Sequence, residues 1–188
     1  TDSILPFSTG VIGAALAVDK IAAALPVLAQ NLDPDHWLDA ATGIMTTDTL
    51  PKAISQQLMV DGETITITGI SKGSGMIKPD MATMLCFVMT DIQASPVLLK
   101  EMLTVAVDLS LNRITVDGDT STNDTVLLMA NGLSGVEVIN DAQRDVFQPV
   151  LDDVLISLAK WLIKDGEGAT RFVTVTVRGA GTQQDAER

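Results

Sequence analysis

Two stretches with alternating apolar and polar residues flank a turn signal in the first half of the chain. Residues 52–60 (KAISQQLMV) precede Asp61-Gly62, and residues 63–70 (ETITITGI) alternate threonine with isoleucine after it. A period of two is typical of a strand with one buried face, and an Asp-Gly pair between two such runs favours a tight hairpin turn. The pattern therefore predicts two paired strands, 52–60 and 63–70.

Four other segments carry apolar residues at helical spacing or begin with residues typical of a helix start. Ser95 precedes Pro96, an order that suits the N-cap and the first helical position, and Asp33 with Pro34 repeats it. Pro26 lies inside an apolar segment and is expected to kink or break that helix. The segments that we predict to be helical are 13–32, 33–45, 95–112 and 144–166, the last with Gly166 at its C-terminal cap.

Three further apolar runs, 83–88, 124–132 and 171–179, are predicted to be strands. The first is almost entirely apolar and the last (RFVTVTVRG) alternates, as buried and half-buried strands do. Helices and strands come in pairs rather than in strict alternation, which favours an α+β fold with mainly antiparallel sheets covered by helices. No linker or repeat divides residues 1–188, so we expect a single domain.

Composition and charge argue against several classes of function. The formal net charge of −12 at pH 7 argues against a nucleic-acid partner and against an anionic membrane surface, since both need a basic face. No stretch reaches the roughly 18 apolar residues of a membrane span. Cys86 is the one cysteine, so a disulfide framework within the chain is impossible, which fits a reducing compartment.

The polar motifs that suggest metal or triad chemistry do not meet its requirements. His36 is the single histidine, which argues against a Ser-His-Asp triad and a His-rich metal site. Residues 117–124 (DGDTSTND) resemble the start of a calcium-binding loop, but Thr122 stands where that loop needs glycine and Leu128 where it needs glutamate. We expect a hydrogen-bonded turn there and no metal site.

Thr83 is the candidate nucleophile that remains. It begins an apolar run within KPDMATMLCFVMTD (78–91), and the glycine-rich KGSG stretch (72–75) lies just upstream. Without a histidine, a threonine hydroxyl can use its own α-amine as the base, and the α-amino pKa of about 7.7–8.0 suits this task. That α-amine exists only if the Ala82–Thr83 bond is cut, and the glycines supply the backbone freedom that straining this bond requires.

An oxyanion site would complete such chemistry. The STG triplet at 8–10 precedes a predicted helix, and backbone N–H groups at a helix N-terminus can bind an oxyanion. Three residues of this kind are common in proteins, so the triplet gains meaning only together with other motifs.

Three long motifs identify a family that the chain resembles. They are KGSGMIKPDMATML (72–85), NRITVDGDTSTNDTVLLMANG (112–132) and DGEGATRFVTVTV (165–177), with STGVIG (8–13) and MTTDT (45–49) in the same family's order. The chain is similar over essentially its whole length to the ornithine acetyltransferase (glutamate N-acetyltransferase) family of arginine biosynthesis. The resemblance implies that the precursor cleaves itself between Ala82 and Thr83. Residues 1–82 would then end an α chain, and residues 83–188 would begin a β chain.

The resemblance also implies roles for individual residues. Thr83 would be the nucleophile that takes the acetyl group, and Thr9 and Gly10 would stabilise the oxyanion. Lys72 suits a substrate carboxylate and Glu167 a substrate amine, whereas outside these motifs both would be interpreted as solvated charges. The substrate-binding positions implied by the family are Thr46, Lys72, Thr83 and Glu167.

The implied reaction is a ping-pong transfer of an acetyl group from N-acetylornithine to glutamate through an acetyl-threonine intermediate, with no cofactor and no metal. An added amino-acid N-acetyltransferase activity would make the enzyme multifunctional. The family fold is a layered αββα arrangement of two stacked sheets between helices, similar in architecture to N-terminal nucleophile hydrolases but with its own connectivity. The resemblance further implies an α2β2 assembly in the cytoplasm, or in the mitochondrial matrix of a eukaryote.

Two alternatives stay open beside this one. A self-processing N-terminal nucleophile amidohydrolase or aminopeptidase would use the same threonine with water as the acceptor, although the three long motifs favour the acetyltransferase. An inactive fragment would serve only as a folded interface module, because family members extend beyond both ends of the matched segment. The segment resembles the central part of a longer precursor. Its motifs do not distinguish the arginine pathway from a secondary-metabolite branch.

Overall fold

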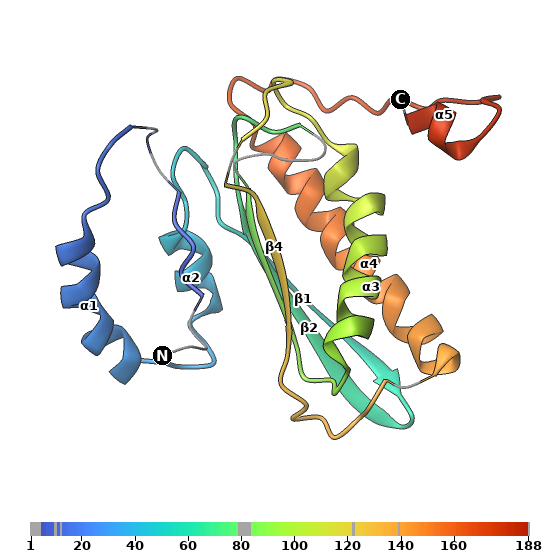
Figure 1. Ribbon diagram of the computed structural model, residues 1–188, viewed down its shortest axis with the longest axis horizontal. Helices are drawn as coiled ribbons and strands as arrows, with labels where there is room; N and C mark the ends of the chain where they lie inside the picture. The colour runs from blue at the N-terminus through green and yellow to red at the C-terminus, as the bar shows by residue number, and fades with distance from the viewer. Residues whose placement is uncertain are drawn as a thin grey trace.

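The computed structural model describes residues 5–9, 11, 13–78, 84–121, 123–138 and 140–187. In chain order, its elements are α1 (Val18–Gln30), α2 (Trp37–Gly43), β1 (Lys52–Val60), β2 (Glu63–Lys72), β3 (Leu85–Thr90), α3 (Pro96–Leu109), the 3-10 helix η1 (Leu111–Arg113), β4 (Thr125–Ala130), α4 (Asp141–Lys164) and α5 (Gln183–Glu187) (Figure 1). The described chain is a mixed α+β protein, as the sequence predicts. Within these ranges, no helix combines the length and the apolar composition that crossing a membrane needs.

The four strands form one sheet in the order β1-β2-β3-β4. The pairs β1–β2 and β2–β3 are antiparallel, and the pair β3–β4 is parallel. Asp61 and Gly62 have positive φ angles of 53° and 89°, the backbone conformation that a two-residue hairpin turn favours. The predicted hairpin is confirmed, and its alternation is too: Ile65 and Ile67 are fully buried, whereas Thr64 is exposed.

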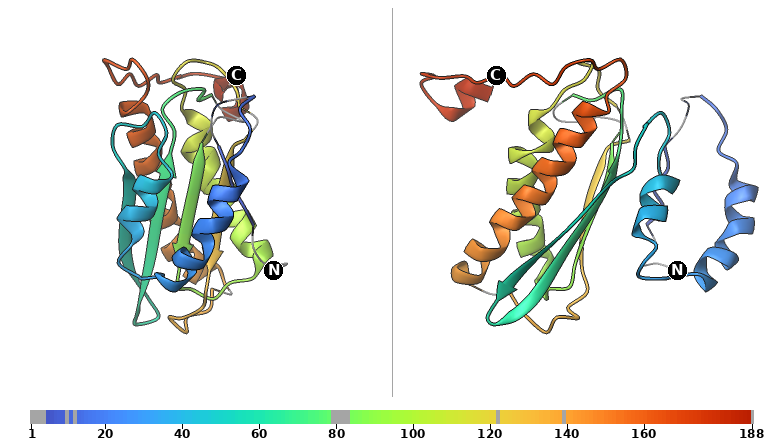
Figure 2. Two further views of the ribbon diagram at one scale, coloured as in Figure 1. Left: turned by 90° about the vertical axis from the view of Figure 1, so that its left-hand side faces the viewer. Right: turned by 180° about the vertical axis from the view of Figure 1, so that it is seen from behind.

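Helices α3 and α4 cover one face of this sheet, as Figure 1 and Figure 2 show. Gly69 of β2 allows α4 to approach closely, because a Cβ at this position would lie 2.9 Å from Leu158 Cδ1 and 3.0 Å from Val154 Cγ1. The side chains of α4 that are buried in this core are Phe147, Leu151, Val154, Leu155, Leu158, Ala159 and Leu162.

The first two helices start later than the pattern predicts. Helix α1 begins at Val18, and Pro26 lies within it without ending it. The predicted cap of the second helix is wrong, because the Asp33 carboxylate accepts the Asp35 N–H at 2.9 Å in a local turn and α2 begins only at Trp37. A short polar side chain that bonds to its own neighbouring backbone competes with helix formation in this way.

The other helices agree with their predicted types. The Ser95 hydroxyl accepts the Leu98 N–H at 3.2 Å, so the predicted N-cap of α3 is confirmed. Helix α4 begins at Asp141, three residues before the predicted start, because the Asn140 side chain accepts the Gln143 N–H at 3.1 Å and caps an extra turn. Within the described residues, the apolar runs predicted as strands in the middle of the chain form β3 and β4.

One predicted strand, 171–179, is wrong. Residues 171–178 have no regular secondary structure, and Val173, Val175 and Val177 are exposed. A strand needs a neighbour for its backbone N–H and C=O groups, and no described strand is paired with this segment. The described chain therefore has one four-stranded sheet, and a second sheet stacked on it stays a prediction.

Candidate functional site

Three predicted site residues, Gly10, Ala82 and Thr83, lie outside the described residues. The residue after them, Met84, is described and leads directly into β3. The roles predicted for these three residues stay predictions, and the site is built from the described residues that belong to the same motifs.

Thr9 lies half-buried on the N-terminal segment. Phe7 of this segment packs its ring edge to face on Phe87 of β3, with the ring centroids 5.5 Å apart. Helix α1 begins only at Val18, so the expectation that residues 8–10 precede a helix N-terminus directly is wrong. An oxyanion role for Thr9 is therefore supported by the motif and not by a helix dipole.

Lys72 and Thr46 meet although 26 residues separate them in the chain. Lys72 ends β2, its side chain is 2% exposed, and its Nζ donates a hydrogen bond to Thr46 Oγ1 at 2.7 Å. Burial lowers the pKa of Lys72; the charges of Asp48 and Asp124 oppose this effect, and the charge of Lys52 adds to it. Two residues predicted to bind substrate thus form one polar pair.

Asp48 contacts the backbone on both sides of this pair. Its carboxylate accepts the Gly73 N–H at 2.7 Å, the Lys52 ammonium at 2.7 Å and the Thr46 N–H at 3.2 Å. Burial by itself would raise the pKa of Asp48, but these hydrogen bonds outweigh it and hold the pKa below its ordinary value. An ionised Asp48 therefore links the segment that carries Thr46 to the residue after Lys72.

A second carboxylate, Asp165 at the C-terminal end of α4, extends this network. Lys52 Nζ donates to Asp165 Oδ2 at 2.5 Å, and the Thr49 N–H donates to the same oxygen at 3.0 Å. The Thr49 hydroxyl donates to the other oxygen. Burial raises the pKa of Asp165, yet the hydrogen bonds from Lys52 and Thr49 bring it below the ordinary value. The network joins the end of α4 to the start of β1.

Glu167 follows two residues later and lies against the glycine-rich loop after β2. Its N–H donates to the Ser74 carbonyl at 2.6 Å, and its carboxylate oxygens lie 3.1 and 3.3 Å from the position of a Cβ on Gly75. The Ser74 hydroxyl also forms a hydrogen bond of 2.6 Å with the Thr47 hydroxyl. A side chain at Gly75 would crowd Glu167, so glycine permits this approach. The loop gathers the segments of three predicted substrate-binding residues, Thr46, Lys72 and Glu167.

Asp124 is a site residue that the sequence analysis does not single out. Its Oδ1 accepts the N–H of Met84, the residue after the predicted nucleophile Thr83, at 2.7 Å. Its Oδ2 is buried and has no hydrogen-bond partner among the described residues. Burial raises the pKa of Asp124, against the opposing effects of the Met84 hydrogen bond and the Lys72 charge. The only signal in the sequence is its place at the end of the polar stretch 117–124.

The start of that polar stretch forms the predicted turn. Asp117 accepts the Asp119 N–H at 3.1 Å, and it also accepts the Met76 and Ile77 N–H groups at 2.5 and 3.1 Å. Burial raises the pKa of Asp117, but these hydrogen bonds hold it below its ordinary value. Asp117 therefore fixes the backbone that follows the glycine-rich loop. In the part of the chain that the structure describes, no cluster of His, Cys, Asp and Glu side chains is arranged to hold a metal ion.

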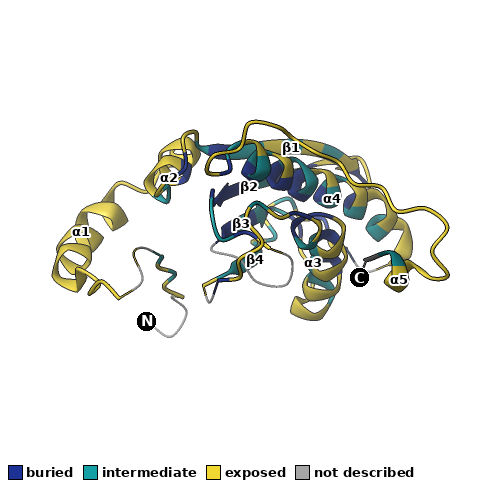
Figure 3. Ribbon diagram, turned by 90° about the horizontal axis from the view of Figure 1, so that it is seen from above, coloured by how far each residue is buried: buried dark blue, intermediate teal, exposed yellow. Residues whose placement is uncertain are grey.

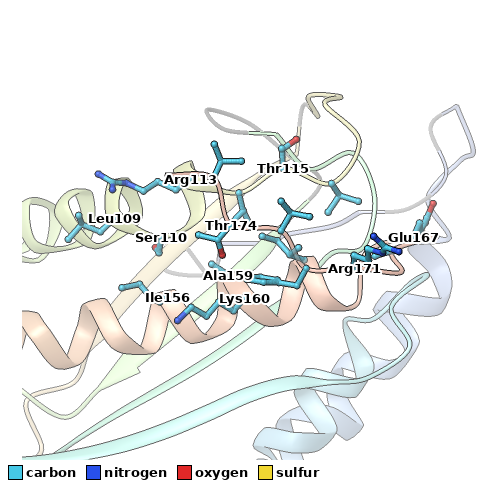
Figure 4. Close-up of a pocket in the computed structure, with 18 residues that line it drawn as sticks. Leu109, Ser110, Arg113, Thr115, Ile156, Ala159, Lys160, Glu167, Arg171 and Thr174 are labelled. Carbon is cyan, nitrogen blue, oxygen red and sulfur yellow. The ribbon is translucent and has the colours of Figure 1, made fainter. Parts of the chain in front are cut away.

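A cavity of about 800 Å³ lies beside this site, between α4, η1 and residues 167–175. Figure 4 shows Arg113 and Lys160 toward one end of it and Glu167 toward the other. Neither Thr46 nor Lys72 lines the cavity. One wall of the cavity is the segment 171–175, which has no regular secondary structure.

Comparison with known proteins agrees with the resemblance in the motifs. The model of the ArgJ family matches residues 1–188. The chain is 49% identical over 186 residues to the arginine biosynthesis bifunctional protein ArgJ of Pseudomonas syringae pv. tomato, and 50% identical over 185 residues to that of Pseudomonas fluorescens. It is 51% identical over 189 residues to that of Colwellia psychrerythraea. These matches cover 97%, 97% and 99% of the chain but 46%, 46% and 45% of the relatives, so the chain spans about half of their length.

Among solved structures, the arginine biosynthesis bifunctional protein ArgJ of Bacillus halodurans is 42% identical in sequence. That match covers 45% of the chain and 41% of the solved protein, with a TM-score of 0.43. The family match over residues 1–188, together with the identity of 49–51% to the three bacterial relatives, shows that this chain belongs to the ArgJ family.

Proposed function

We propose that the protein carrying this chain transfers an acetyl group from N-acetylornithine to glutamate through acetyl-Thr83. The observation that carries the proposal is the contact between Lys72 and Thr46, with Glu167 held against the same loop. Membership of a family whose relatives are named arginine biosynthesis bifunctional proteins supports it. Their bifunctional character would correspond to an added amino-acid N-acetyltransferase activity.

The charges around the glycine-rich loop suit an amino acid as the substrate. The Lys72 ammonium group can bind a carboxylate, and because it donates to Thr46 Oγ1, the Thr46 hydroxyl keeps its own proton for a second acceptor. Glu167 is exposed and can bind a substrate amine. Opposite charges on two sides of one loop hold a zwitterion in a single orientation.

The transfer requires two substitutions at one carbonyl carbon. The Thr83 hydroxyl attacks the acetyl carbonyl of N-acetylornithine while its proton passes to the Thr83 α-amine, the amide C–N bond breaks, and ornithine leaves with that proton. The amine of glutamate then attacks the ester and loses a proton to the Thr83 α-amine, the C–O bond to Thr83 breaks, and the threonine oxygen takes that proton. Thr9 and Gly10 would stabilise the oxyanion formed in each half-reaction.

The free α-amine of Thr83 requires a prior cleavage of the chain. The Thr83 hydroxyl would attack the Ala82 carbonyl, the peptide C–N bond would give way to an ester, and water would hydrolyse that ester. The products would be a chain that ends at Ala82 and a chain that begins at Thr83. We expect these chains to stay together in an α2β2 assembly in the cytoplasm or, in a eukaryote, in the mitochondrial matrix.

Mass spectrometry and an acetyl-transfer assay on the protein expressed from its complete gene test this proposal. The wild type should be recovered as two chains and should form N-acetylglutamate from N-acetylornithine and glutamate. Thr83→Ala should abolish cleavage and transfer, whereas Thr83→Ser, which keeps a hydroxyl, should retain part of each. Cleavage or transfer by Thr83→Ala would overturn the proposal. Release of free acetate without N-acetylglutamate would indicate the amidohydrolase instead.

A further inference from the structure

We infer that Asp48 is a positioning residue for substrate binding, which fixes Thr46 and Lys72 relative to each other. This role of Asp48 rests on the proposed function for what Thr46 and Lys72 bind. The contacts that define this role are the hydrogen bonds from the Thr46 and Gly73 N–H groups to the Asp48 carboxylate.

The Asp48 carboxylate joins two segments that are far apart in the sequence. Its Oδ1 accepts the Gly73 N–H at 2.7 Å, and its Oδ2 accepts the Thr46 N–H at 3.2 Å. Gly73 follows Lys72 directly, so each oxygen holds the backbone at or next to one substrate-binding residue. Gly73 has a φ of 147°, in a region that favours glycine. Asp48 therefore sets the distance across which Lys72 Nζ reaches Thr46 Oγ1.

Lys52 holds Asp48 in place in turn. Lys52 is 2% exposed, and its ammonium group lies 2.7 Å from Asp48 Oδ1 and 2.5 Å from Asp165 Oδ2. A buried polar network whose members are all hydrogen-bonded keeps one arrangement, because any other leaves a charge without a partner. Asp165 precedes Glu167 by two residues, so the same network connects the Lys72 side of the site to the Glu167 side.

Asp48 also acts on the charge of Lys72. The charged groups that influence Lys72 are Asp48, Lys52 and Asp124, and burial together with Lys52 lowers the pKa of Lys72 while the two carboxylates raise it. Removing the negative charge of Asp48 therefore lowers the pKa of Lys72 further. Because a substrate carboxylate binds the ammonium form, binding would then fail at a lower pH than in the wild type.

Asp48→Asn, which keeps the shape and removes the charge, tests this role in the protein expressed from its complete gene. Asp19→Asn, an exposed carboxylate on α1, is the matched control. We expect the KM for N-acetylornithine to rise about 10- to 100-fold, the range that losing one hydrogen bond to a charged group produces, with a smaller change in kcat. The alkaline limb of the kcat/KM profile should move to lower pH, which a loss of folded protein would not cause. An unchanged KM and pH profile would overturn the inference.

A double-mutant cycle shows whether Asp48 acts through Lys72. In a Lys72→Met background, Asp48→Asn should add little to the rise in KM, because the residue that it positions is already gone. Fully additive effects of the two substitutions would contradict the inference.

Hydrogen exchange of the wild type keeps the test independent of whether Asp48→Asn folds. The amide hydrogens of Thr46 and Gly73 should exchange slowly, since both donate to the Asp48 carboxylate. Fast exchange of both would overturn the inference by itself. If the wild-type protein transferred no acetyl group, the proposed function would be wrong. The exchange rates would still decide whether Asp48 holds the segments that carry Thr46 and Gly73.

Discussion

Helices α1 and α4 both carry apolar residues at helical spacing, yet they end in different environments. Seven side chains of α4 are buried, whereas α1 has none. Figure 3 shows the buried residues gathered on α4 and the sheet, and α1 exposed along its length. An amphipathic pattern specifies a helix and one apolar face, but only a partner surface turns that face into a core.

The strands show the same contrast. Strand β2 alternates isoleucine with threonine and pairs with β1 on one side and β3 on the other. Residues 171–178 alternate valine with threonine and pair with no described strand. Alternation specifies which face would be buried, and a neighbouring strand decides whether the segment becomes a strand. We call β1–β4 with α3 and α4 the packed layer, and α1 with residues 171–178 the exposed segments.

The candidate site takes its fixed groups from the ends of the packed layer. Lys72 ends β2, Lys52 begins β1, and Asp165 follows α4. Thr46 and Asp48 come from the segment just before β1 and are tied to these ends by hydrogen bonds. The rigid positions that a binding site needs therefore come from burial in the packed layer, because an apolar and polar pattern alone does not fix a segment in place.

The largest expected effect is a difference in stability between two substitutions, one in the packed layer and one in the exposed segments. Leu158 is fully buried and faces Gly69, so Leu158→Ala should lower the free energy of unfolding by about 2–5 kcal/mol. Leu28 in α1 is 60% exposed, and Leu28→Ala should change the free energy of unfolding by less than about 0.5 kcal/mol. Urea unfolding of both variants makes the comparison, and equal losses would remove the distinction between the regions.

Overfilling the packed layer should cost less than emptying it. Gly69→Ala should lower the free energy of unfolding by about 1–3 kcal/mol, because its Cβ would lie 2.9 Å from Leu158 and 3.0 Å from Val154. Gly43→Ala at the end of α2, where a Cβ would meet nothing within 4 Å, is the control and should be neutral or stabilising. Combined with Leu158→Ala, Gly69→Ala should cost less than it does alone. Strict additivity would show that the two residues do not share this space.

Acid should weaken the packed layer at the edge where Asp48 and Asp165 lie. The folded-state pKa of each is lowered, because hydrogen bonds outweigh burial. Each carboxylate therefore adds stability above its unfolded-state pKa of about 3.9, and this contribution is lost as the pH falls through the lower folded-state pKa. Unfolding followed below about pH 3.9 should show the loss, and Asp165→Asn should make it smaller. An acid profile identical to that of the wild type would contradict the role of Asp165.

The smallest expected effect lies in the exposed segments. Val175 is 83% exposed, and Val175→Thr should change the free energy of unfolding by less than about 0.5 kcal/mol. Val88 in β3 is fully buried, and Val88→Thr places a hydroxyl in the core at a cost of about 1–3 kcal/mol. Thermal unfolding distinguishes the two variants. A large loss in Val175→Thr would show that residues 171–178 are packed against something in the protein.

The sequence predicts the features that have a local cause. Asp61-Gly62 specifies the hairpin because the turn depends on the backbone freedom of those two residues, and Ser95 caps α3 through the adjacent turn. The strand predicted at 171–179 is wrong because its formation depends on a partner that its own residues do not encode. Pairing between strands that no short turn connects is a property of the whole fold, and no local spacing signals it.

The sequence likewise predicts only part of the candidate site. Resemblance in the motifs selects Thr46 and Lys72, and the structure brings their side chains together. Asp48 lies in the same MTTDT stretch as Thr46, but its importance depends on the fold that brings Gly73 and Lys52 to its carboxylate. Asp124 is interpreted from the sequence as part of a polar turn, because nothing nearby in the chain reveals that it binds Met84.

The acetyl-transfer chemistry proposed for the site depends on whether Thr83 carries an acetyl group during turnover. Peptide mass spectrometry of the protein incubated with N-acetylornithine in the absence of glutamate measures this. We expect one acetyl group on the peptide that begins with Thr83, and its disappearance when glutamate is added. Turnover without any acetylated Thr83, or an acetyl group that glutamate removes from a different residue, would contradict the proposed chemistry.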